Sequence, residues 1–463
     1  CALPILAPHF PSGSESGPQS AIAPLLEPPA AVAPSTPCTL GLDLGSSGAR
    51  VALVEASPHG SCAVIWERSI PYPGPFTDPL SWRGALIDLV AAVPRRWQHR
   101  VAAIAIDGTS GTLLLCRPDG TLLPGDLAHA LPYHHACPAQ QSAAAALVEG
   151  RGPAASASGS LARALELLAR ARAAGIDGPL LLRHQADWLM GWLLGDWSWG
   201  EEGNNLRLGW DLQERRWSGR IAAQTWAEAL PRIRSSGAVL GRLGCEAARQ
   251  LSLGHACCVV AGSTDANAAV LAAEASPGDG IAVLGTTLVL KQFVPEPLEG
   301  PGISCHRVAG LWLVGGASNA GAGILSRFFN VAQIAALSRQ IDPDQPTGLE
   351  LRPLLSRGER FPVDNPGLEA VLGPRPVSDA RYLQALLEGL TAIEREGWER
   401  LRQLGAPAVG RVITLGGGAR NPQWRQLRQR ALGIPVLNRP QLSAASGMAR
   451  LALASLRQGD PLA

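Results

Sequence analysis

The segment Gly41–Arg50 is the feature that most constrains what this chain can fold into. It reads Gly-Leu-Asp-Leu-Gly-Ser-Ser-Gly-Ala-Arg between apolar runs, which predicts a strand, a tight turn and a second strand. Its glycines let the backbone turn N–H groups toward an anion, and Ser46 and Ser47 add hydroxyl donors. Asp43 would repel a phosphate unless Mg²⁺ lay between them. The segment therefore indicates a metal–nucleotide site, although an ordinary hairpin with a glycine turn fits the same residues.

Composition limits the class of protein. The chain has 463 residues, 46% of them hydrophobic and 17% charged, which is typical of a globular protein with two or more domains. A net charge of +2 argues against a nucleic-acid partner. No uninterrupted apolar run approaches the ~18 residues of a membrane span. Nine scattered cysteines without metal-ligand spacing predict free, mostly buried thiols in a reducing cytoplasm.

The first 37 residues differ from the rest of the chain. Pro, Ala and Ser dominate residues 8–37 without a period, which predicts a disordered, dispensable extension. An organelle transit peptide is usually rich in Arg, and this stretch has none.

The usual nucleotide-binding signatures are missing from the sequence. Lys291 is the single lysine, and it follows Leu290 rather than a glycine, so no Gly-Lys-Ser/Thr triplet of a Walker A loop occurs. Protein-kinase motifs and a Gly-x-Gly-x-x-Gly helix start are also missing. A nucleotide must therefore bind in another way.

The second half repeats the opening pattern. Residues 281–291 again read strand, turn, strand, with Gly285, Thr286 and Thr287 in the turn. Repetition is a stronger signal than either copy alone and predicts a duplicated core that holds a nucleotide between its halves. Thr286 and Thr287 could also be simple β-formers. The turn at Ser276–Gly280 is the predicted domain boundary.

Polar residues also follow three further predicted strands. Asp107 follows the strand at residues 101–106, and Asp265 follows the strand at residues 256–261 just before a helix. Either carboxylate could be catalytic or merely cap a turn or helix. Near the C-terminus, Gly416–Gly418 precedes Asn421 and Pro422, which is a strong helix start. These glycines would let a flat ligand approach the backbone, although a tight turn explains them as well.

In this order, the segments resemble the FGGY carbohydrate kinases over roughly Thr39 to Leu456. The resemblance implies an α/β fold of two ribonuclease-H-like domains, as in the actin and Hsp70 ATPases, with an interdomain cleft. It implies a sugar-binding and catalytic domain at residues 38–275 and a nucleotide-binding domain at residues 276–458. The small-residue stretch at residues 443–454 resembles the family's last helix.

The same resemblance implies an enzyme that uses ATP and Mg²⁺ to phosphorylate a sugar. Asp265 matches the catalytic base, and Asp43 matches a second catalytic carboxylate that holds Mg²⁺ through water. The remaining implied contacts are with the sugar (Asp43, Ser46, Ser47, Ser110 and Asp265), with the phosphates (Gly45, Ser46, Ser47, Gly285, Thr286 and Thr287) and with adenosine (Gly417, Gly418 and Asn421).

Within the family, the chain resembles the cyanobacterial and plant-chloroplast kinases of D-ribulose, which share its Gly41–Arg50 and Ile106–Thr112 segments. This implies that D-ribulose is converted to its 5-phosphate, by a cytoplasmic or chloroplast enzyme that is a monomer or homodimer. Many members carry Trp-x-Asp-x-Arg where this chain has Tyr133–Cys137, so D-xylulose, L-ribulose, glycerol or a heptulose are alternatives. A non-catalytic, nucleotide-gated regulator of the same superfamily is another.

Overall fold

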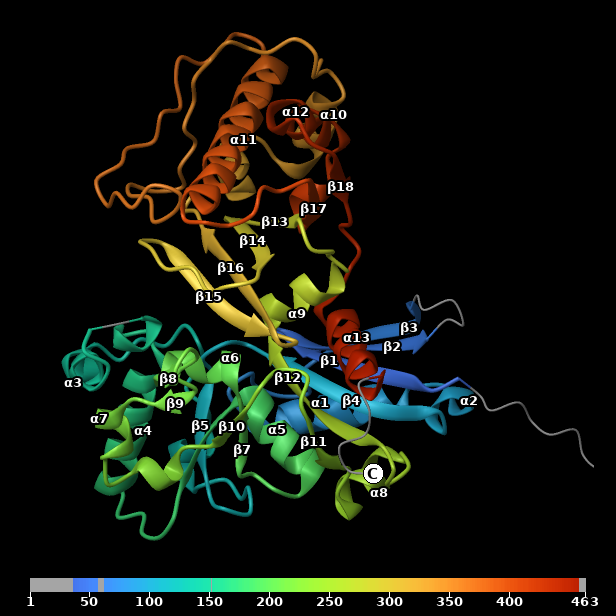
Figure 1. Ribbon diagram of the computed structural model, residues 1–463, viewed down its shortest axis with the longest axis vertical. Helices are drawn as coiled ribbons and strands as arrows, with labels where there is room; N and C mark the ends of the chain where they lie inside the picture. The colour runs from blue at the N-terminus through green and yellow to red at the C-terminus, as the bar shows by residue number, and fades with distance from the viewer. Residues whose placement is uncertain (1–35, 57–61, 151, 458–463) are drawn as a thin grey trace, which may run out of the picture. The chain divides into compact units, whose positions relative to one another are not determined.

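The computed structural model describes residues 36–56, 62–150 and 152–457 (Figure 1). Of the extension predicted at residues 1–37, residues 1–35 therefore lie outside the described part of the chain. None of the described cysteines forms a disulfide, and five of them are buried. In the described part of the chain, no helix is both long enough and apolar enough to cross a bilayer.

The first sheet has six strands in the order β11-β12-β4-β1-β2-β3. Strands β1, β2 and β3 form an antiparallel meander, and β4 and β12 continue the sheet parallel to β1. Leu40, Leu42 and Leu44 alternate along β1 and are fully buried in the core. The bounds of these strands are β1 Cys38–Leu44, β2 Gly48–Ala56, β3 Cys62–Pro71, β4 Val101–Gly108, β11 Val239–Arg242 and β12 Cys258–Thr264.

The second sheet repeats this arrangement in the order β15-β16-β14-β13-β17-β18. Strands β13, β14 and β16 are antiparallel, while β17 and β18 run parallel to β13. Both sheets therefore consist of three antiparallel strands and two parallel ones, with one added edge strand. The predicted duplication is confirmed. These strands are β13 Asp279–Leu284, β14 Leu288–Val294, β15 Ile303–Val308, β16 Leu311–Ala317, β17 Arg411–Leu415 and β18 Val436–Asn438.

Helices and short strand pairs complete the described structure. The short strands are β5 Leu113–Cys116, β6 Leu181–His184, β7 Trp199–Glu201, β8 Trp210–Asp211, β9 Arg216–Trp217 and β10 Arg232–Arg234. The α-helices are α1 Pro79–Ala91, α2 Arg95–Gln98, α3 Gln141–Leu147, α4 Ser160–Ala173, α5 Gln185–Leu194, α6 Glu202–Asn205, α7 Gly219–Ala222, α8 Cys245–Leu251, α9 Asp265–Ala272, α10 Val331–Ser338, α11 Asp379–Gln403, α12 Pro422–Leu432 and α13 Ala444–Arg457. The 3₁₀ helices are η1 Gly125–Ala128, η2 Pro138–Gln140, η3 Pro153–Ala155, η4 Leu206–Leu208, η5 Ala227–Ala229, η6 Ala322–Arg327 and η7 Gly417–Arg420.

The last helix of the chain, α13, packs on the first sheet and on α9 (Figure 1). Small residues make this close approach possible. A Cβ on Gly41 would lie 2.0 Å from the Ala445 carbonyl oxygen, and one on Gly447 would lie 1.9 Å from that of Ala268. The Thr39 hydroxyl donates to the Ala449 carbonyl at 2.7 Å. Helix α13 thus covers β1, whose end carries Asp43.

Candidate active site

Three carboxyl groups lie at the carboxyl ends of neighbouring parallel strands. Asp43 on β1 is in register with Asp107 on β4, which is in register with Ser263 on β12. Asp265 follows two residues later as the first residue of α9. Ligands of open α/β sheets bind outside the carboxyl ends of such strands. The structure therefore brings together the two carboxylates predicted to be catalytic, with Asp107 between them in the strand order.

Burial governs the protonation of all three groups. It raises the pKa of Asp43, which the interaction with Asp107 and the charge of Arg50 partly offset. Burial also raises the pKa of Asp265 to about 6, opposed by the Ala266 N–H and reinforced by the charge of Asp43. Asp107 is fully buried and its pKa lies well above the usual value, because burial and the charges of Asp43 and Asp265 all disfavour ionisation.

Asp107 is a candidate site residue whose role the sequence left open. Neither of its carboxyl oxygens has a hydrogen-bond partner among the described residues. A turn cap would accept an N–H of its own turn, but the Thr109 N–H donates to Gln185 at 3.0 Å instead, so Asp107 does not cap that turn. A buried carboxyl group without partners is costly, and Asp107 lies between the two other carboxyl groups in the strand order.

The helix-cap interpretation of Asp265 is also wrong. Thr264 is the N-cap of α9, because its hydroxyl accepts the Asn267 N–H at 3.4 Å. Asp265 is the next residue, is half-buried, and accepts the Ala266 N–H at 2.8 Å. The backbone N–H of Ser110 also stabilises the charged form of Asp265, so Ser110 lies beside it as expected of two residues in one site.

Gln185 at the start of α5 connects the two turns around these carboxyls. Its Oε1 accepts from the backbone and the hydroxyl of Thr109, at 3.0 and 2.8 Å. Its Nε2 donates to the Tyr72 hydroxyl at 3.5 Å, and that hydroxyl donates to the Gly45 carbonyl at 2.8 Å. These contacts fix the turn at Ser110 relative to the turn at Gly45.

Both predicted glycine-hydroxyl turns connect antiparallel strands and begin with a glycine, but the first has four residues between its paired strand ends and the second has three. In the first, the Gly45 N–H bonds the Gly48 carbonyl at 3.0 Å; in the second, the Gly285 N–H bonds the Thr287 carbonyl at 3.2 Å. Ser46, Ser47 and Thr286 are exposed at the tips. Because Thr286 and Thr287 lie between β13 and β14, their interpretation as β-formers is wrong. No hydrogen bond or ion pair between described residues joins one turn to the other.

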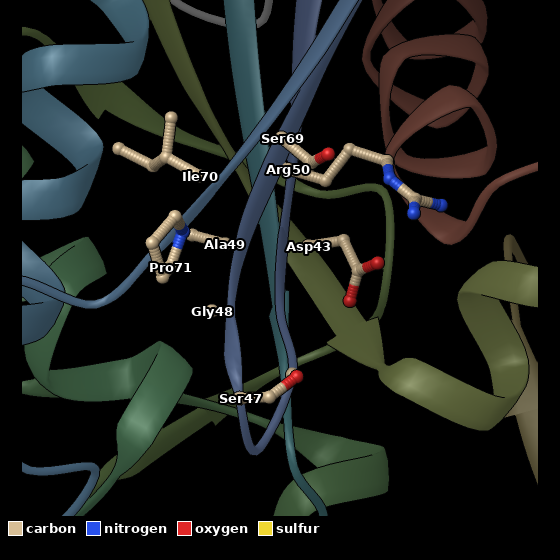
Figure 2. A pocket seen from close by; sticks show the side chains of 9 residues that line it. Asp43, Ser47, Gly48, Ala49, Arg50, Ser69, Ile70 and Pro71 are labelled. Carbon is tan, nitrogen blue, oxygen red and sulfur yellow. The ribbon is translucent and has the colours of Figure 1, made fainter.

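A pocket of about 410 Å³ opens beside the first turn (Figure 2). Asp43, Gly45, Ser47 and Arg50 line it together with β3 residues Ser69–Pro71. The carboxylate of Asp43 and the hydroxyl of Ser47 both project from the β1–β2 hairpin in Figure 2. The pocket thus combines the hydroxyl of Ser47, the guanidinium of Arg50 and the carboxylate of Asp43 in its lining.

The third glycine segment lies against the second turn. Gly416 has φ +84°, and a Cβ there would lie 2.8 Å from the carbonyl oxygen of Leu284, which directly precedes Gly285. Gly417 is exposed, while Gly418 packs on Leu284. Asn421 caps α12 as predicted, accepting the Trp424 N–H at 3.0 Å and donating to Ser338 at 2.8 Å. Its side-chain amide is thus engaged within the fold, and its predicted adenosine contact stays a prediction.

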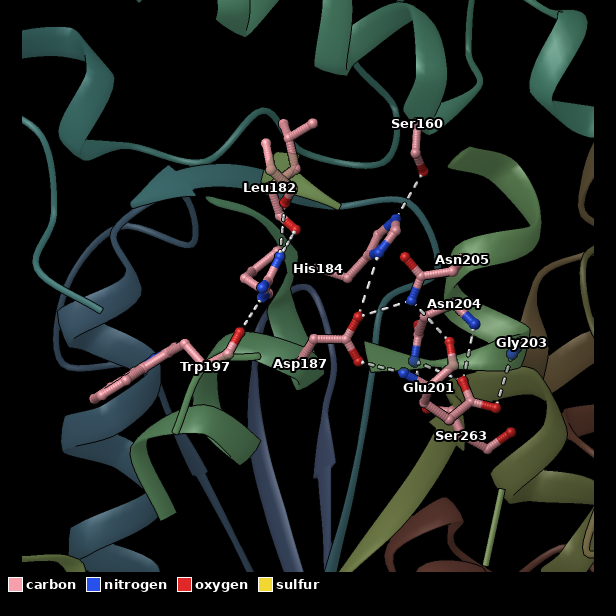
Figure 3. A network of polar contacts seen from close by, with 12 residues as sticks. Ser160, Leu182, His184, Asp187, Trp197, Glu201, Gly203, Asn204, Asn205 and Ser263 are labelled. Carbon is pink, nitrogen blue, oxygen red and sulfur yellow. Dashed lines mark hydrogen bonds and ion pairs between the residues drawn. The ribbon is translucent and has the colours of Figure 1, made fainter. Parts of the chain in front are cut away.

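A buried polar network that the sequence did not reveal connects α6 to β12, the strand that precedes Asp265 (Figure 3). Glu201 caps α6 by accepting the N–H groups of Gly203 and Asn204, each at 2.8 Å. The Asn204 amide donates to the Ser263 carbonyl on β12 at 3.3 Å. Helix α6 is therefore fixed to the strand that leads to Asp265.

The same network contains a serine–histidine–aspartate arrangement. His184 Nε2 lies 3.0 Å from the Ser160 hydroxyl, and its Nδ1 lies 3.5 Å from Asp187. All three side chains are at most 1% exposed. A substrate cannot reach them, so the arrangement is structural.

A resident metal cluster is not present in the described part of the chain. There, no three His, Cys, Asp or Glu side chains are arranged to hold a metal ion. Mg²⁺ in phosphoryl-transfer sites is usually held by one or two carboxylates together with substrate phosphates and water. The half-buried Asp43, which lines the pocket of about 410 Å³, fits that mode.

Comparison with solved structures defines the class of fold. The chain is similar to a xylulose kinase from Rhodospirillum rubrum, with a TM-score of 0.74 and 22% identity over 92% of this chain and 91% of that one. It is also similar to the Plasmodium falciparum glycerol kinase solved with ADP, with a TM-score of 0.72 and 14% identity over the same shares, 92% and 91%. The predicted fold of two α/β domains is confirmed.

Sequence comparison then finds a family match for part of the chain. Residues 280–456 match the model of the FGGY family of carbohydrate kinases, C-terminal domain. An L-fuculokinase from Salmonella typhi is 27% identical over 240 residues, which cover 49% of this chain and 50% of that enzyme. The match thus spans about half the length of this curated relative. Residues 280–456 are thus similar to the C-terminal domain of FGGY carbohydrate kinases.

Proposed function

We propose that the protein is an ATP-dependent carbohydrate kinase that converts D-ribulose to D-ribulose 5-phosphate. The observation that carries this proposal is the pair formed by Asp265 and Asp43 at the ends of parallel strands, beside the first of two matched glycine-hydroxyl turns. The family match to residues 280–456 supports the same activity. Phosphoryl transfer needs a substrate hydroxyl that accepts the phosphoryl group, a base that accepts its proton, and a site that binds the phosphates.

In the proposed mechanism, Asp265 accepts the proton of the attacking sugar hydroxyl. A carboxylate with a pKa of about 6 is mostly ionised at neutral pH and yet remains a better base than an exposed aspartate. The turns at Gly45–Ser47 and Gly285–Thr287 bind the phosphates through backbone N–H groups and hydroxyls, and Gly417 and Gly418 receive the adenosine. Asp43 would hold Mg²⁺ through water, and the ion supplies neutralisation of phosphate charge.

The substrate proposal depends on the loop at Tyr133–Cys137. Arg163 is fully buried and donates to the carbonyls of Gly111 and His135, both at 2.9 Å, and to that of Tyr133. The Thr112 hydroxyl accepts the Tyr133 N–H at 3.1 Å. These bonds hold Tyr133, which is 41% exposed, next to the Ser110 turn. We propose that Tyr133 and the adjacent His134 contact the sugar in place of charged residues.

A coupled ADP-release assay with the purified full chain tests the proposed function. We expect D-ribulose to give turnover well above the ATP-only background, and D-xylulose, L-ribulose, glycerol and a heptulose to give less. Turnover of another sugar alone would contradict the substrate but not the kinase activity. Background rates with every sugar would contradict the kinase activity and favour a nucleotide-gated regulator, which the uncharged Tyr133–Cys137 loop would also fit.

The pH dependence of kcat/KM gives a second test. Asp265 must be ionised to accept a proton, so kcat/KM should fall tenfold per pH unit below a midpoint of about 6. The charge of Asp43 raises the pKa of Asp265 and the charge of Arg207 lowers it, while the charge of Asp265 in turn raises the pKa of Asp107. The full pH profile should be measured with saturating Mg-ATP. An acid midpoint near 4 would show that Asp265 is not the group that titrates.

A further inference from the structure

Arg207 is a half-buried cation beside the proposed base. It lies in η4, two residues after the end of α6. The charges of Arg207 and Asp265 attract each other. Yet Arg207 forms no ion pair or hydrogen bond with any residue in the described part of the chain. An arginine without partners at a partly buried position has five donors available for a ligand.

The Ser110–Gly111 turn separates Arg207 from Asp265. The Ser110 N–H stabilises the Asp265 carboxylate. On the other side, a Cβ on Gly111 would lie 3.6 Å from Cδ of Arg207. The base and the guanidinium therefore flank one short turn, and a substrate group bound to Asp265 lies within reach of Arg207.

The position of Arg207 is fixed by the network beneath it. The Asn205 amide donates to the Glu201 carbonyl at 2.8 Å and to the Asp187 carboxylate at 3.0 Å. Gly209 has φ +106°, and a Cβ there would lie 2.3 Å from Ile221. These constraints hold the segment rigid on both sides of Arg207, which suits a preorganised catalytic group.

The second sheet approaches the same side chain. His306 on β15 is close enough that the positive charges of Lys291 and Arg207 lower its pKa, after burial as the main cause. Its Nδ1 is buried without a hydrogen-bond partner among the described residues. Arg207 thus lies close to the neutral imidazole of His306, in a region where α6 of the first half contacts β15 of the second sheet.

The carboxyl groups create a need for such a cation. Ionised Asp43 and Asp265 would repel the oxygens of a phosphoryl group that moves toward the acceptor hydroxyl. Arg50 lies beside Asp43 on the side of the first turn. Arg207 supplies positive charge on the side of Asp265.

We infer, on the basis of the proposed function, that Arg207 is a catalytic residue that contacts the phosphoryl group as it passes to the substrate hydroxyl. In this step the bond between the terminal phosphorus of ATP and its bridging oxygen breaks, and ADP leaves with the electron pair. A new bond forms between that phosphorus and the sugar hydroxyl oxygen, whose proton goes to Asp265. The guanidinium donates hydrogen bonds to the phosphoryl oxygens throughout.

Two other roles for Arg207 predict different results. If the guanidinium only lowered the proton affinity of Asp265, the activity lost on its removal would return at high pH. If it recognised an acidic group on the substrate, its removal would affect sugar acids and leave neutral sugars unchanged.

The test compares Arg207→Gln, Arg207→Lys and Arg207→Ala with Arg216→Gln, whose arginine is 73% exposed on β9. With the neutral sugar turned over best, we expect Arg207→Gln to lower kcat by about 10³-fold or more. Its KM values and ATP affinity should stay within about threefold of wild type, which also shows that it folds. The loss should be constant between pH 6 and 9. Arg207→Lys should keep part of the activity, and guanidinium ion should partly restore Arg207→Ala.

Several outcomes would overturn the inference. These are a kcat of Arg207→Gln within threefold of an active wild type, a loss that disappears at high pH, or a loss confined to sugar acids. Arg216→Gln should match the wild type, and an equal loss there would show that the effect is not specific to Arg207. A wild type without turnover on any sugar would refute the proposed function itself, and the inference with it.

Discussion

Replacing Asp265 with asparagine should lower kcat by about 10²–10⁴-fold, the usual contribution of a general base. Asparagine keeps the shape of the side chain and an oxygen that can accept the Ala266 N–H, but its amide cannot accept a proton at neutral pH. The structure gives Asp265 no role in holding the nucleotide turns, so ATP affinity should stay within about twofold of wild type. Steady-state kinetics and calorimetric titration with a non-hydrolysable ATP analogue measure the two effects separately.

Asp379 offers a matched control for this substitution. Like Asp265, it is the first residue of a helix, and it forms an exposed ion pair with Arg375 at 2.7 Å. Asp379→Asn should leave kcat unchanged, because exposed ion pairs contribute little. Full turnover by Asp265→Asn would show that another group accepts the proton. Loss of ATP binding together with turnover would instead assign Asp265 to the nucleotide site.

The sequence predicted those parts of the site that depend on local patterns. The turns at Gly45–Ser47 and Gly285–Thr287 follow from glycine and hydroxyl residues between apolar strands, and the cap at Asn421 follows from the proline after it. Duplication of the core could be predicted because the same pattern occurs twice. Each turn and the cap depend on residues that are close together in the sequence.

The rest depends on contacts between distant parts of the chain. Asp107 could not be distinguished from a turn cap, because its burial results from the register of β4 with β1 and β12. Arg207 lies in an irregular stretch without periodicity, and only the folded network brings it beside Asp265. Likewise, the small residues of α13 predict close packing but not that the helix covers the first sheet.

Breaking the buried ion pair between Arg428 and Glu394, near Gly416–Gly418, should have the largest effect on stability. Arg428 on α12 bonds both oxygens of Glu394 on α11, at 2.6 and 2.7 Å, and bonds the Thr414 hydroxyl on β17 at 2.6 Å. Both charged side chains are only 1% exposed. Arg428→Met should lower the free energy of unfolding by about 3–5 kcal/mol, because the Glu394 charge is left buried without its partner. Urea denaturation followed by tryptophan fluorescence measures the change.

The double variant Arg428→Met with Glu394→Gln separates the cost of the stranded charge from the loss of packing. Glutamine removes the charge but can still accept the Trp398 indole N–H, which Glu394 binds at 3.2 Å. Since replacing a buried ion pair by uncharged groups is often nearly neutral, the double variant should recover most of the lost stability. A double variant as unstable as Arg428→Met would mean that the arginine acts through its packing and its bond to Thr414.

Because β17 and α12 flank Gly416–Gly418, Arg428→Met should also weaken binding of the ATP analogue if those glycines receive adenosine. The double variant should restore that binding.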